Sequence, residues 1–130
     1  MADIKILKEK LQGIKVLFVD DEEDIRKGTG AFLEKFFDNV IICSDGQEGL
    51  NIFKENSDIK IVITDVMMPK MSGPEMVHQI TKINPDVFIV YISASRGAEY
   101  EKETARSIYV KKPLSYDDMK YILQKIEEIV

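Results

Sequence analysis

Residues 59–73, with the sequence Ile59-Lys60-Ile61-Val62-Ile63-Thr64-Asp65-Val66-Met67-Met68-Pro69-Lys70-Met71-Ser72-Gly73, decide the fold of this chain. The stretch begins with a run of β-branched residues that is typical of a strand buried on both faces. The run ends at Asp65, and Pro69 and Gly73 then mark a turn before the next helix. In open α/β sheets, ligands bind beyond the carboxyl ends of the strands. Asp65 is therefore a candidate site residue, although Asp is also common in turns.

The composition is that of one ordinary globular domain. The chain has 130 residues, of which 45% are hydrophobic and 32% charged. The net charge of −5 argues against a surface that binds nucleic acid. The single Cys43 lies in an apolar run and is expected to be buried, whereas the single His78 is expected at the surface. No signal-peptide core or membrane-spanning segment is present in the sequence, so we expect a cytoplasmic protein.

Hydrophobic periodicity predicts strands that alternate with helices. The expected strands are 14–19, 40–43, 59–65, 87–92 and 108–110. The expected helices are 3–12, 25–37, one around Leu50 and Phe53, 74–83, 97–106, and a last one from about Met119 to Val130. The segment 97–106 offers almost no apolar stripe, so we expect that helix to be held loosely.

This alternation favours an α/β fold, because parallel strands need crossover connections. We expect a single doubly wound parallel sheet of five strands with helices on both faces. Residues 14–130 would form this domain, and residues 1–13 would be a short N-terminal extension. The carboxyl ends of all the strands would then lie at one edge of the sheet.

Polar residues follow four of these strand ends. They are Asp20, Asp21, Asp65, Ser93 and Lys112. Three crowded carboxylates would repel one another unless a cation neutralised them, and Mg²⁺ prefers such oxygen ligands. A lysine and a hydroxyl beside the metal suit the oxygens of a phosphoryl group. Asp65, at the centre, is then the natural nucleophile, because carboxylates can form aspartyl-phosphates.

Taken alone, these residues also have plainer interpretations. Asp20 and Asp21 suit the first turn of a helix, and Ser93 suits a turn. Lys111 could compete with Lys112 for the site. Side chains alternate along a strand, however, so only one of the two lysines can face the carboxylates, and we assign Lys111 to solvent.

Five motifs follow one another along the chain: Asp20-Asp21, Asp65 with Met68-Pro69 and Gly73, Ser93-Ala94, and Tyr109 followed by Lys112-Pro113. With these motifs the chain resembles, over nearly all of its length after Gly13, the receiver domain of two-component response regulators. It is similar to the single-domain, CheY-like chemotaxis regulators. The resemblance implies a flavodoxin-like sheet with the strand order 2-1-3-4-5. It also implies a phosphoprotein of a histidine-to-aspartate phosphorelay in signal transduction, not an enzyme beyond its own phosphotransfer and dephosphorylation.

The resemblance also implies a role for each matching residue. Asp65 would accept the phosphoryl group, and Asp21, Asp65 and the main-chain carbonyl of Met67 would bind Mg²⁺ directly. Asp20 would act on the ion through water. Lys112 would contact a phosphoryl oxygen, next to a cis peptide bond before Pro113.

The same resemblance implies a switch and its partners. Ser93 and Tyr109 would form the switch pair, although a tyrosine on a short strand is also common as half-buried packing. A histidine kinase or phosphotransfer protein would be the phosphodonor. A downstream protein would bind the face made by residues 97–130, with no output domain among these residues, and a phosphorylation-dependent dimer is a further expectation.

Two other functions fit the sequence less well. A phosphatase or related hydrolase would usually need an acid two residues after the nucleophile, where this chain has Met67. A flavin or nucleotide carrier would need a glycine-rich loop after the first strand, where acidic residues stand instead. Met67 and Ser95 also replace polar side chains that family members often use for phosphoryl turnover, which concerns the lifetime of the phosphorylated form.

Overall fold

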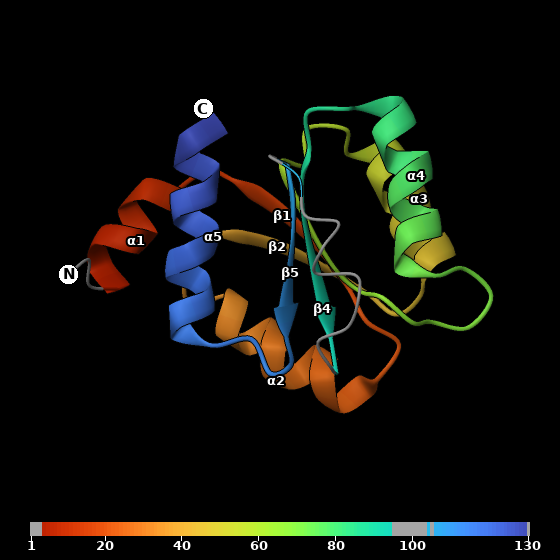
Figure 1. Cartoon of the computed structure of the whole chain (residues 1–130), viewed down its shortest axis with the longest axis horizontal. Coiled ribbons are helices and arrows are strands. Elements are labelled where there is room, and N and C mark those ends of the chain that lie inside the picture. Colours follow the sequence, from red (N-terminus) through yellow and green to blue (C-terminus); the bar gives the residue numbers. More distant parts are fainter. Residues whose placement is uncertain (1–3, 95–103, 105, 130) are drawn as a thin grey trace.

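The computed structural model describes residues 4–94, 104 and 106–129 of the chain. The elements are α1 (Ile4–Leu11), β1 (Lys15–Val19), α2 (Glu23–Leu33), β2 (Asn39–Cys43), α3 (Gly46–Glu55), β3 (Ile61–Asp65), α4 (Gly73–Ile83), β4 (Phe88–Ser93), β5 (Ser107–Lys111) and α5 (Tyr116–Ile129). They form a sheet that lies between two groups of helices (Figure 1). The predicted α/β class is therefore confirmed.

The sheet has five parallel strands in the order β2-β1-β3-β4-β5, as the resemblance implied. β3 lies in the centre, and every one of its residues is buried. This burial explains why its sequence is a continuous apolar run and does not alternate. Because all the strands run in the same direction, their carboxyl ends share one edge of the sheet.

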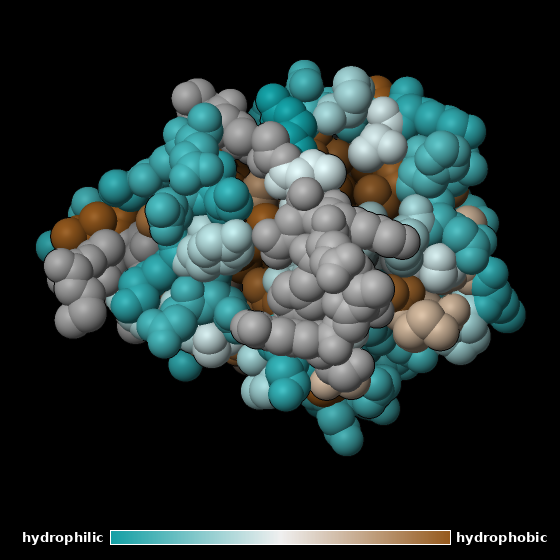
Figure 2. Space-filling model, viewed as in Figure 1, coloured by the Kyte–Doolittle hydropathy of each residue, from teal (hydrophilic) through white to brown (hydrophobic). Residues whose placement is uncertain are grey.

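Alternate side chains along the strands enter two apolar cores, one on each face. One core contains residues of α1, α2 and α5, and the other contains residues of α3 and α4. Figure 1 shows α1 and α5 on one side of the strands and α3 and α4 on the other. The viewed face is hydrophilic over α4 and α5, as expected for helices that turn their apolar stripes inward (Figure 2).

The N-terminal helix contributes to the first core. Leu11 at its end is fully buried there, and Lys10 Nζ lies 2.8 Å from Glu127 Oε1 of α5. The helix expected at residues 3–12 is confirmed as α1.

Several predicted boundaries were wrong. α2 ends at Leu33, not near Phe37, because residues 34–36 form a turn. The side chains of Phe36 and Phe37 still enter the core and so continue the apolar pattern. β2 begins at Asn39, one residue before the expected strand 40–43, and β3 begins at Ile61 although Ile59 is also buried.

The helix expected at 97–106 lies largely outside the described residues. At its end, Thr104 forms an isolated bridge with Ser107, and Arg106 is in a turn, so no helix extends to residue 106.

Cys43 is buried, and His78 is exposed, as the sequence predicted. Burial, followed by the charge of Glu48, raises the pKa of the Cys43 thiol to about 12. The thiol therefore remains protonated and unreactive at neutral pH.

Gly73 allows α4 to begin against the end of the central strand. Its main-chain N–H donates to the carbonyl oxygen of Val66 at 2.9 Å. A Cβ atom at this position would overlap the main-chain oxygen of Asp65 and crowd the side chain of Thr64. Only glycine therefore fits without a shift of the backbone that carries Asp65.

We expect Gly73→Ala to lower the free energy of unfolding by about 1–3 kcal/mol, because the added methyl group forces the backbone apart. Gly28→Ala is the matched control, since Gly28 is exposed in α2 and a Cβ there meets no atom within 4 Å. The control should gain roughly 0.5–1 kcal/mol from helix propensity. Urea denaturation measures both, and equal effects of the two substitutions would contradict this interpretation of Gly73.

Candidate functional site

The carboxyl edge of the sheet brings together residues that are distant in the sequence. Asp20 follows β1, Asp65 is the last residue of β3, and Lys112 follows β5. The parallel register pairs Val19 with Thr64, so the two aspartates leave neighbouring strands at the same level. Asp20 is fully buried, and Asp65 is 6% exposed. Buried carboxylates need partners, because removing an unpaired charge from water is costly.

Lys112 is the cation that meets both aspartates. Its Nζ lies 3.2 Å from Asp20 Oδ2, 3.2 Å from Asp65 Oδ2 and 3.7 Å from Glu22 Oε1. Its main-chain N–H donates to the carbonyl oxygen of Ser93 at 2.7 Å, which ties the lysine to the end of β4. The peptide bond between Lys112 and Pro113 is cis, as the resemblance implied. The neighbouring Lys111 is exposed, as predicted from strand alternation.

Asp20 is fixed by the start of α2. Its Oδ1 accepts a hydrogen bond from the main-chain N–H of Glu22 at 2.9 Å, and its carbonyl oxygen accepts one from Arg26 at 2.8 Å. Its Oδ2 is buried and accepts no hydrogen bond from any residue that the structure describes. Lys112 Nζ forms an ion pair with this oxygen at 3.2 Å. A buried oxygen with spare acceptor capacity is suited to a metal ion or its bound water.

Four carboxylates surround this position. One oxygen each from Asp20, Asp21, Glu22 and Asp65 lies within 4.8 Å of the others. Asp20, Asp21 and Asp65 were predicted from their strand ends, but Glu22 was missed as a site residue. The only signal for Glu22 was its place in the acidic run after β1, and its position depends on the turn that begins α2.

The electrostatics show an excess of negative charge. Burial raises the pKa of Asp65, the charges of Asp20 and Asp21 raise it further, and Lys112 opposes them without restoring the ordinary value. Burial lowers the pKa of Lys112, but its interactions with Asp20 and Asp65 outweigh burial and raise it. One lysine therefore does not balance the carboxylates, and the all-oxygen donor set fits a hard divalent cation such as Mg²⁺.

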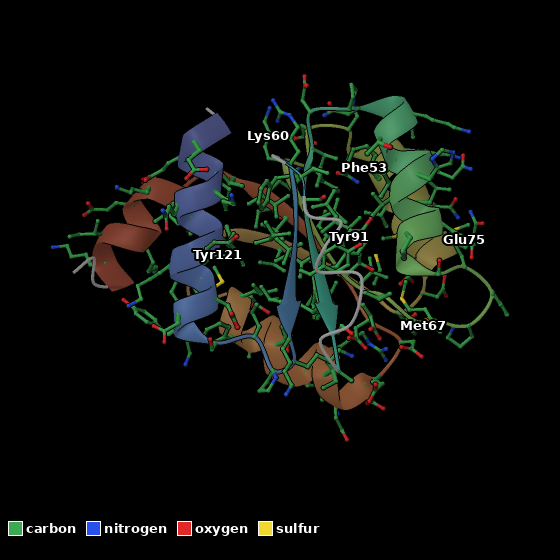
Figure 3. All side chains as sticks on the ribbon, in the orientation of Figure 1. Phe53, Lys60, Met67, Glu75, Tyr91 and Tyr121 are labelled. Atoms are coloured by element: carbon green, nitrogen blue, oxygen red, sulfur yellow. The ribbon has the colours of Figure 1, made fainter. Side chains whose placement is uncertain are left out.

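The remaining predicted residues lie around this cluster. Ser93 is half-buried at the end of β4, and Tyr109 is buried on β5. Met67 is 79% exposed on the loop after β3 (Figure 3). Tyr91, which the sequence did not single out, stacks on Tyr109.

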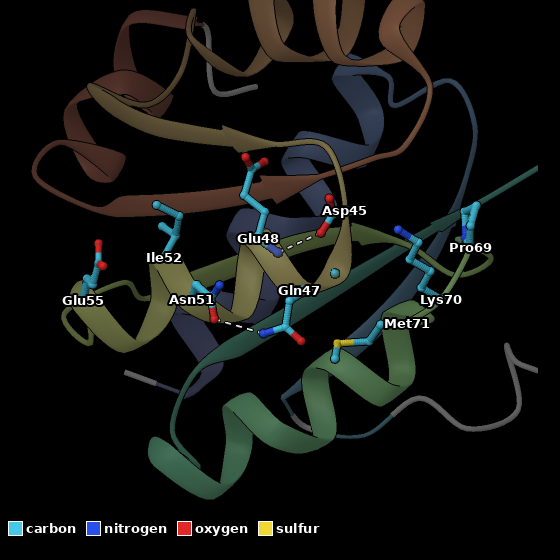
Figure 4. A pocket seen from close by; sticks show the side chains of 10 residues that line it. Asp45, Gln47, Glu48, Asn51, Ile52, Glu55, Pro69, Lys70 and Met71 are labelled. Carbon is cyan, nitrogen blue, oxygen red and sulfur yellow. Dashed lines mark hydrogen bonds between the residues drawn. The ribbon is translucent and has the colours of Figure 1, made fainter.

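A separate hollow of about 560 Å³ lies beside the site, between α3 and the loop after β3. Figure 4 shows Lys70 and Met71 of that loop opposite Gln47 and Asn51 of α3. Lys70 adopts a φ of 68°, a left-handed conformation that is uncommon for a residue with a side chain. None of the four clustered acids lines this hollow.

A parallel sheet that brings a lysine and buried carboxylates together at its carboxyl edge is the arrangement that the resemblance to receiver domains implied. The chain belongs to the response regulator receiver domain family, whose family model matches residues 16–124. Receiver domains are signalling modules of two-component systems and not enzymes in the ordinary sense. They bind Mg²⁺ in an acidic pocket and interact with histidine kinases and downstream partners.

Individual relatives support this assignment. Response regulator RR06 of Streptococcus pneumoniae is 36% identical over 106 residues, which cover 78% of this chain and 48% of that protein. A response regulator receiver domain protein from Clostridium thermocellum has 30% identity and a TM-score of 0.73, over 90% of this chain and 99% of that chain.

A CheX–CheY–BeF3–Mg complex from Borrelia burgdorferi is also similar in structure. The matched chain of that complex has 25% identity to this chain and a TM-score of 0.69, over 89% of this chain and 88% of the matched chain. The chain spans only 12%, 48%, 28% and 40% of the length of four curated relatives that it matches.

The raised pKa of Asp65 predicts the sign of the change in stability when this residue is replaced by asparagine. Its ionised form is disfavoured by folding, so Asp65→Asn should stabilise the metal-free protein at pH 7. This gain should shrink as the pH falls towards the unfolded-state pKa of about 3.9, where the wild-type carboxyl becomes protonated. Urea denaturation without divalent cations, at pH 7 and near pH 4, measures the difference.

Asp58→Asn is the control with the opposite sign. A hydrogen bond from Lys15 lowers the pKa of Asp58, and the two side chains also form an ion pair of 2.9 Å. Asp58→Asn should therefore be less stable than the wild type at pH 7, and the deficit should vanish as the pH falls through the folded-state pKa of Asp58. A wild type that is more stable than Asp65→Asn at pH 7 would contradict the proposed charge imbalance.

Proposed function

We propose that this receiver domain accepts a phosphoryl group on Asp65 from the phosphohistidine of a histidine kinase or phosphotransfer protein. The observation that carries the proposal is the buried Asp65 carboxylate, which lies 3.2 Å from Lys112 and within a cluster of four acids. An Asp65 oxygen would attack phosphorus, and the P–N bond to the imidazole would break. The imidazole would keep the electron pair and take a proton.

The surrounding residues would stabilise the transferred group. Lys112 would turn from the carboxylate oxygens to a phosphoryl oxygen as a point charge, and the Ser93 hydroxyl would donate to another oxygen. Asp21, Asp65 and the main-chain carbonyl of Met67 would hold Mg²⁺, with Asp20 acting through water. The bound ion would neutralise negative charge on the carboxylates and on the phosphoryl oxygens. Catalysis by this chain would be limited to its own phosphotransfer and dephosphorylation.

Phosphorylation would act on a partner-binding face. It replaces the single charge of the Asp65 carboxylate with about −1.5 to −2 charges on the phosphoryl oxygens, which can draw the Ser93 hydroxyl inward and favour the buried ring of Tyr109. The face would include β5 and α5 within the segment 97–130, and it would bind a downstream protein or a second phosphorylated copy.

The limits and location of the domain are part of the same proposal. Residues 14–130 would be the receiver domain, with residues 1–13 as its extension, and the protein would be cytoplasmic. None of the helices that the structure describes combines the length and apolarity needed to span a bilayer.

We expect Asp65→Asn to abolish phosphorylation by acetyl phosphate in the presence of Mg²⁺, because an amide is a poor nucleophile. Asp45→Asn is the control. Asp45 also follows a strand, but its side chain caps α3 by accepting the main-chain N–H of Glu48 at 2.8 Å. Intact-mass spectrometry should show one added phosphoryl group on the wild type and the control only. Full phosphorylation of Asp65→Asn would exclude Asp65 as the acceptor.

Mg²⁺ binding to the unmodified domain should be lost in Asp21→Ala, because one direct ligand is removed. Glu23→Ala is the matched control from the same acidic run, since Glu23 instead pairs with Lys27 at 3.1 Å on the surface of α2. Isothermal titration calorimetry should show weak binding by the wild type and Glu23→Ala, and none by Asp21→Ala at the same concentrations. Unchanged binding by Asp21→Ala would place the ion elsewhere.

A further inference from the structure

Two tyrosines form a stacked pair on neighbouring strands. Tyr91 of β4 and Tyr109 of β5 are direct partners in the parallel register. Their ring centroids lie 4.6 Å apart, and the ring planes differ by 21°. The two residues are only 7% and 8% exposed. Figure 3 shows Tyr91 on the side of the sheet that faces α3 and α4.

The pair belongs to a row of side chains that reaches the site. The register pairs Thr64 with Tyr91, and Tyr91 with Tyr109, so the three residues lie side by side across the sheet. Thr64 precedes Asp65, and its hydroxyl donates to the Asp65 carbonyl oxygen at 2.9 Å. Ser93 lies two residues after Tyr91 and therefore on the same face of β4. Tyr91 thus lies between Thr64, the residue before the candidate phosphoacceptor, and the candidate switch tyrosine.

A stacked aromatic neighbour favours a buried ring over one turned to solvent, beyond the gain from burying apolar area. Burial, followed by Tyr109, raises the pKa of the Tyr91 phenol to about 12, so Tyr91 remains neutral at physiological pH. A ligand that requires one conformation binds more tightly when that conformation is already populated. A preformed stack would therefore increase affinity for a phosphoryl group without touching it.

We propose that Tyr91 is a positioning residue that holds the Tyr109 ring in its buried orientation before phosphorylation. The unphosphorylated domain is then biased towards the conformation that the phosphoryl group stabilises. This proposal rests on the proposed roles of Asp65 as acceptor and Tyr109 as switch. The proposal adds Tyr91 to these two residues. The aromatic ring of Tyr91, and not its hydroxyl group, would carry the positioning role.

Beryllofluoride, a phosphoryl mimic, tests the proposal by titration in the presence of Mg²⁺. Tyr91→Leu keeps an apolar side chain but removes the ring, and its affinity should fall roughly 2- to 12-fold, the range that aromatic stacking supports. Tyr91→Phe keeps the ring and should bind as the wild type does. Phe53→Leu is the packing control, because Phe53 lies on α3 in the same core and loses a ring in the same way. Its affinity should remain unchanged.

A second measurement reads Tyr109 directly. In protein with ¹³C-labelled tyrosine, Tyr109→Phe assigns the ring signals, and a soluble paramagnetic probe reports their exposure. Tyr91→Leu should make the Tyr109 ring more exposed, whereas Tyr91→Phe and Phe53→Leu should not. If Tyr91→Leu does not fold, Tyr91→Met provides the same comparison.

An unchanged Tyr109 ring in Tyr91→Leu would overturn the proposal, as would an equal loss of affinity in Phe53→Leu. Failure of the wild type to bind beryllofluoride would instead refute the phosphoacceptor function. The ring measurement would still show in that case whether Tyr91 positions Tyr109.

Discussion

One lysine between two buried carboxylates is the interaction on which the site depends. Burying ions costs several kcal/mol each, roughly, and pairing offsets this only with good geometry and further hydrogen bonds. Lys112 lies 3.2 Å from each aspartate, but Asp20 Oδ2 accepts no hydrogen bond from the described residues. Burial therefore raises the pKa of Asp65, and the pairing with Lys112 opposes this rise without cancelling it. The folded domain therefore has an excess of negative charge at this edge, which a bound cation would neutralise.

The apolar residues of the sheet stabilise the fold and offset the unfavourable free energy of the excess negative charge at the site. β3 is buried on both faces, so a carboxylate could be placed only at its end, where the sheet meets the surface. The strands on either side have the same constraint, and the parallel direction brings their ends to one edge. The crowded charges thus lie at the end of the sheet, where core residues such as Val19 and Val66 directly adjoin Asp20 and Asp65. Mutations within the site can change its electrostatics while the cores continue to hold the fold.

Most of the fold could be predicted from the sequence because it depends on local periodicity. Strand ends also placed Asp20, Asp65 and Lys112 correctly, since a parallel sheet allows only one common edge. Glu22 was missed because its position depends on a turn held by Asp20. Tyr91 was missed because the partner of a strand residue depends on register between strands, which no local pattern encodes. The end of α2 was misplaced because buried turn residues continue a helical apolar pattern.

The backbone at Asp65 has little freedom to transmit a signal. Its carbonyl oxygen accepts the Thr64 hydroxyl at 2.9 Å, and Gly73 approaches it so closely that even a methyl group would not fit. Well-packed regions respond by switching between discrete arrangements and not by gradual deformation. A change of charge at Asp65 is therefore more easily accommodated by side chains around the fixed strand end than by movement of the strand. Tyr109, on the outermost strand β5, has one neighbouring strand instead of two, so Tyr91 is its only partner in this row.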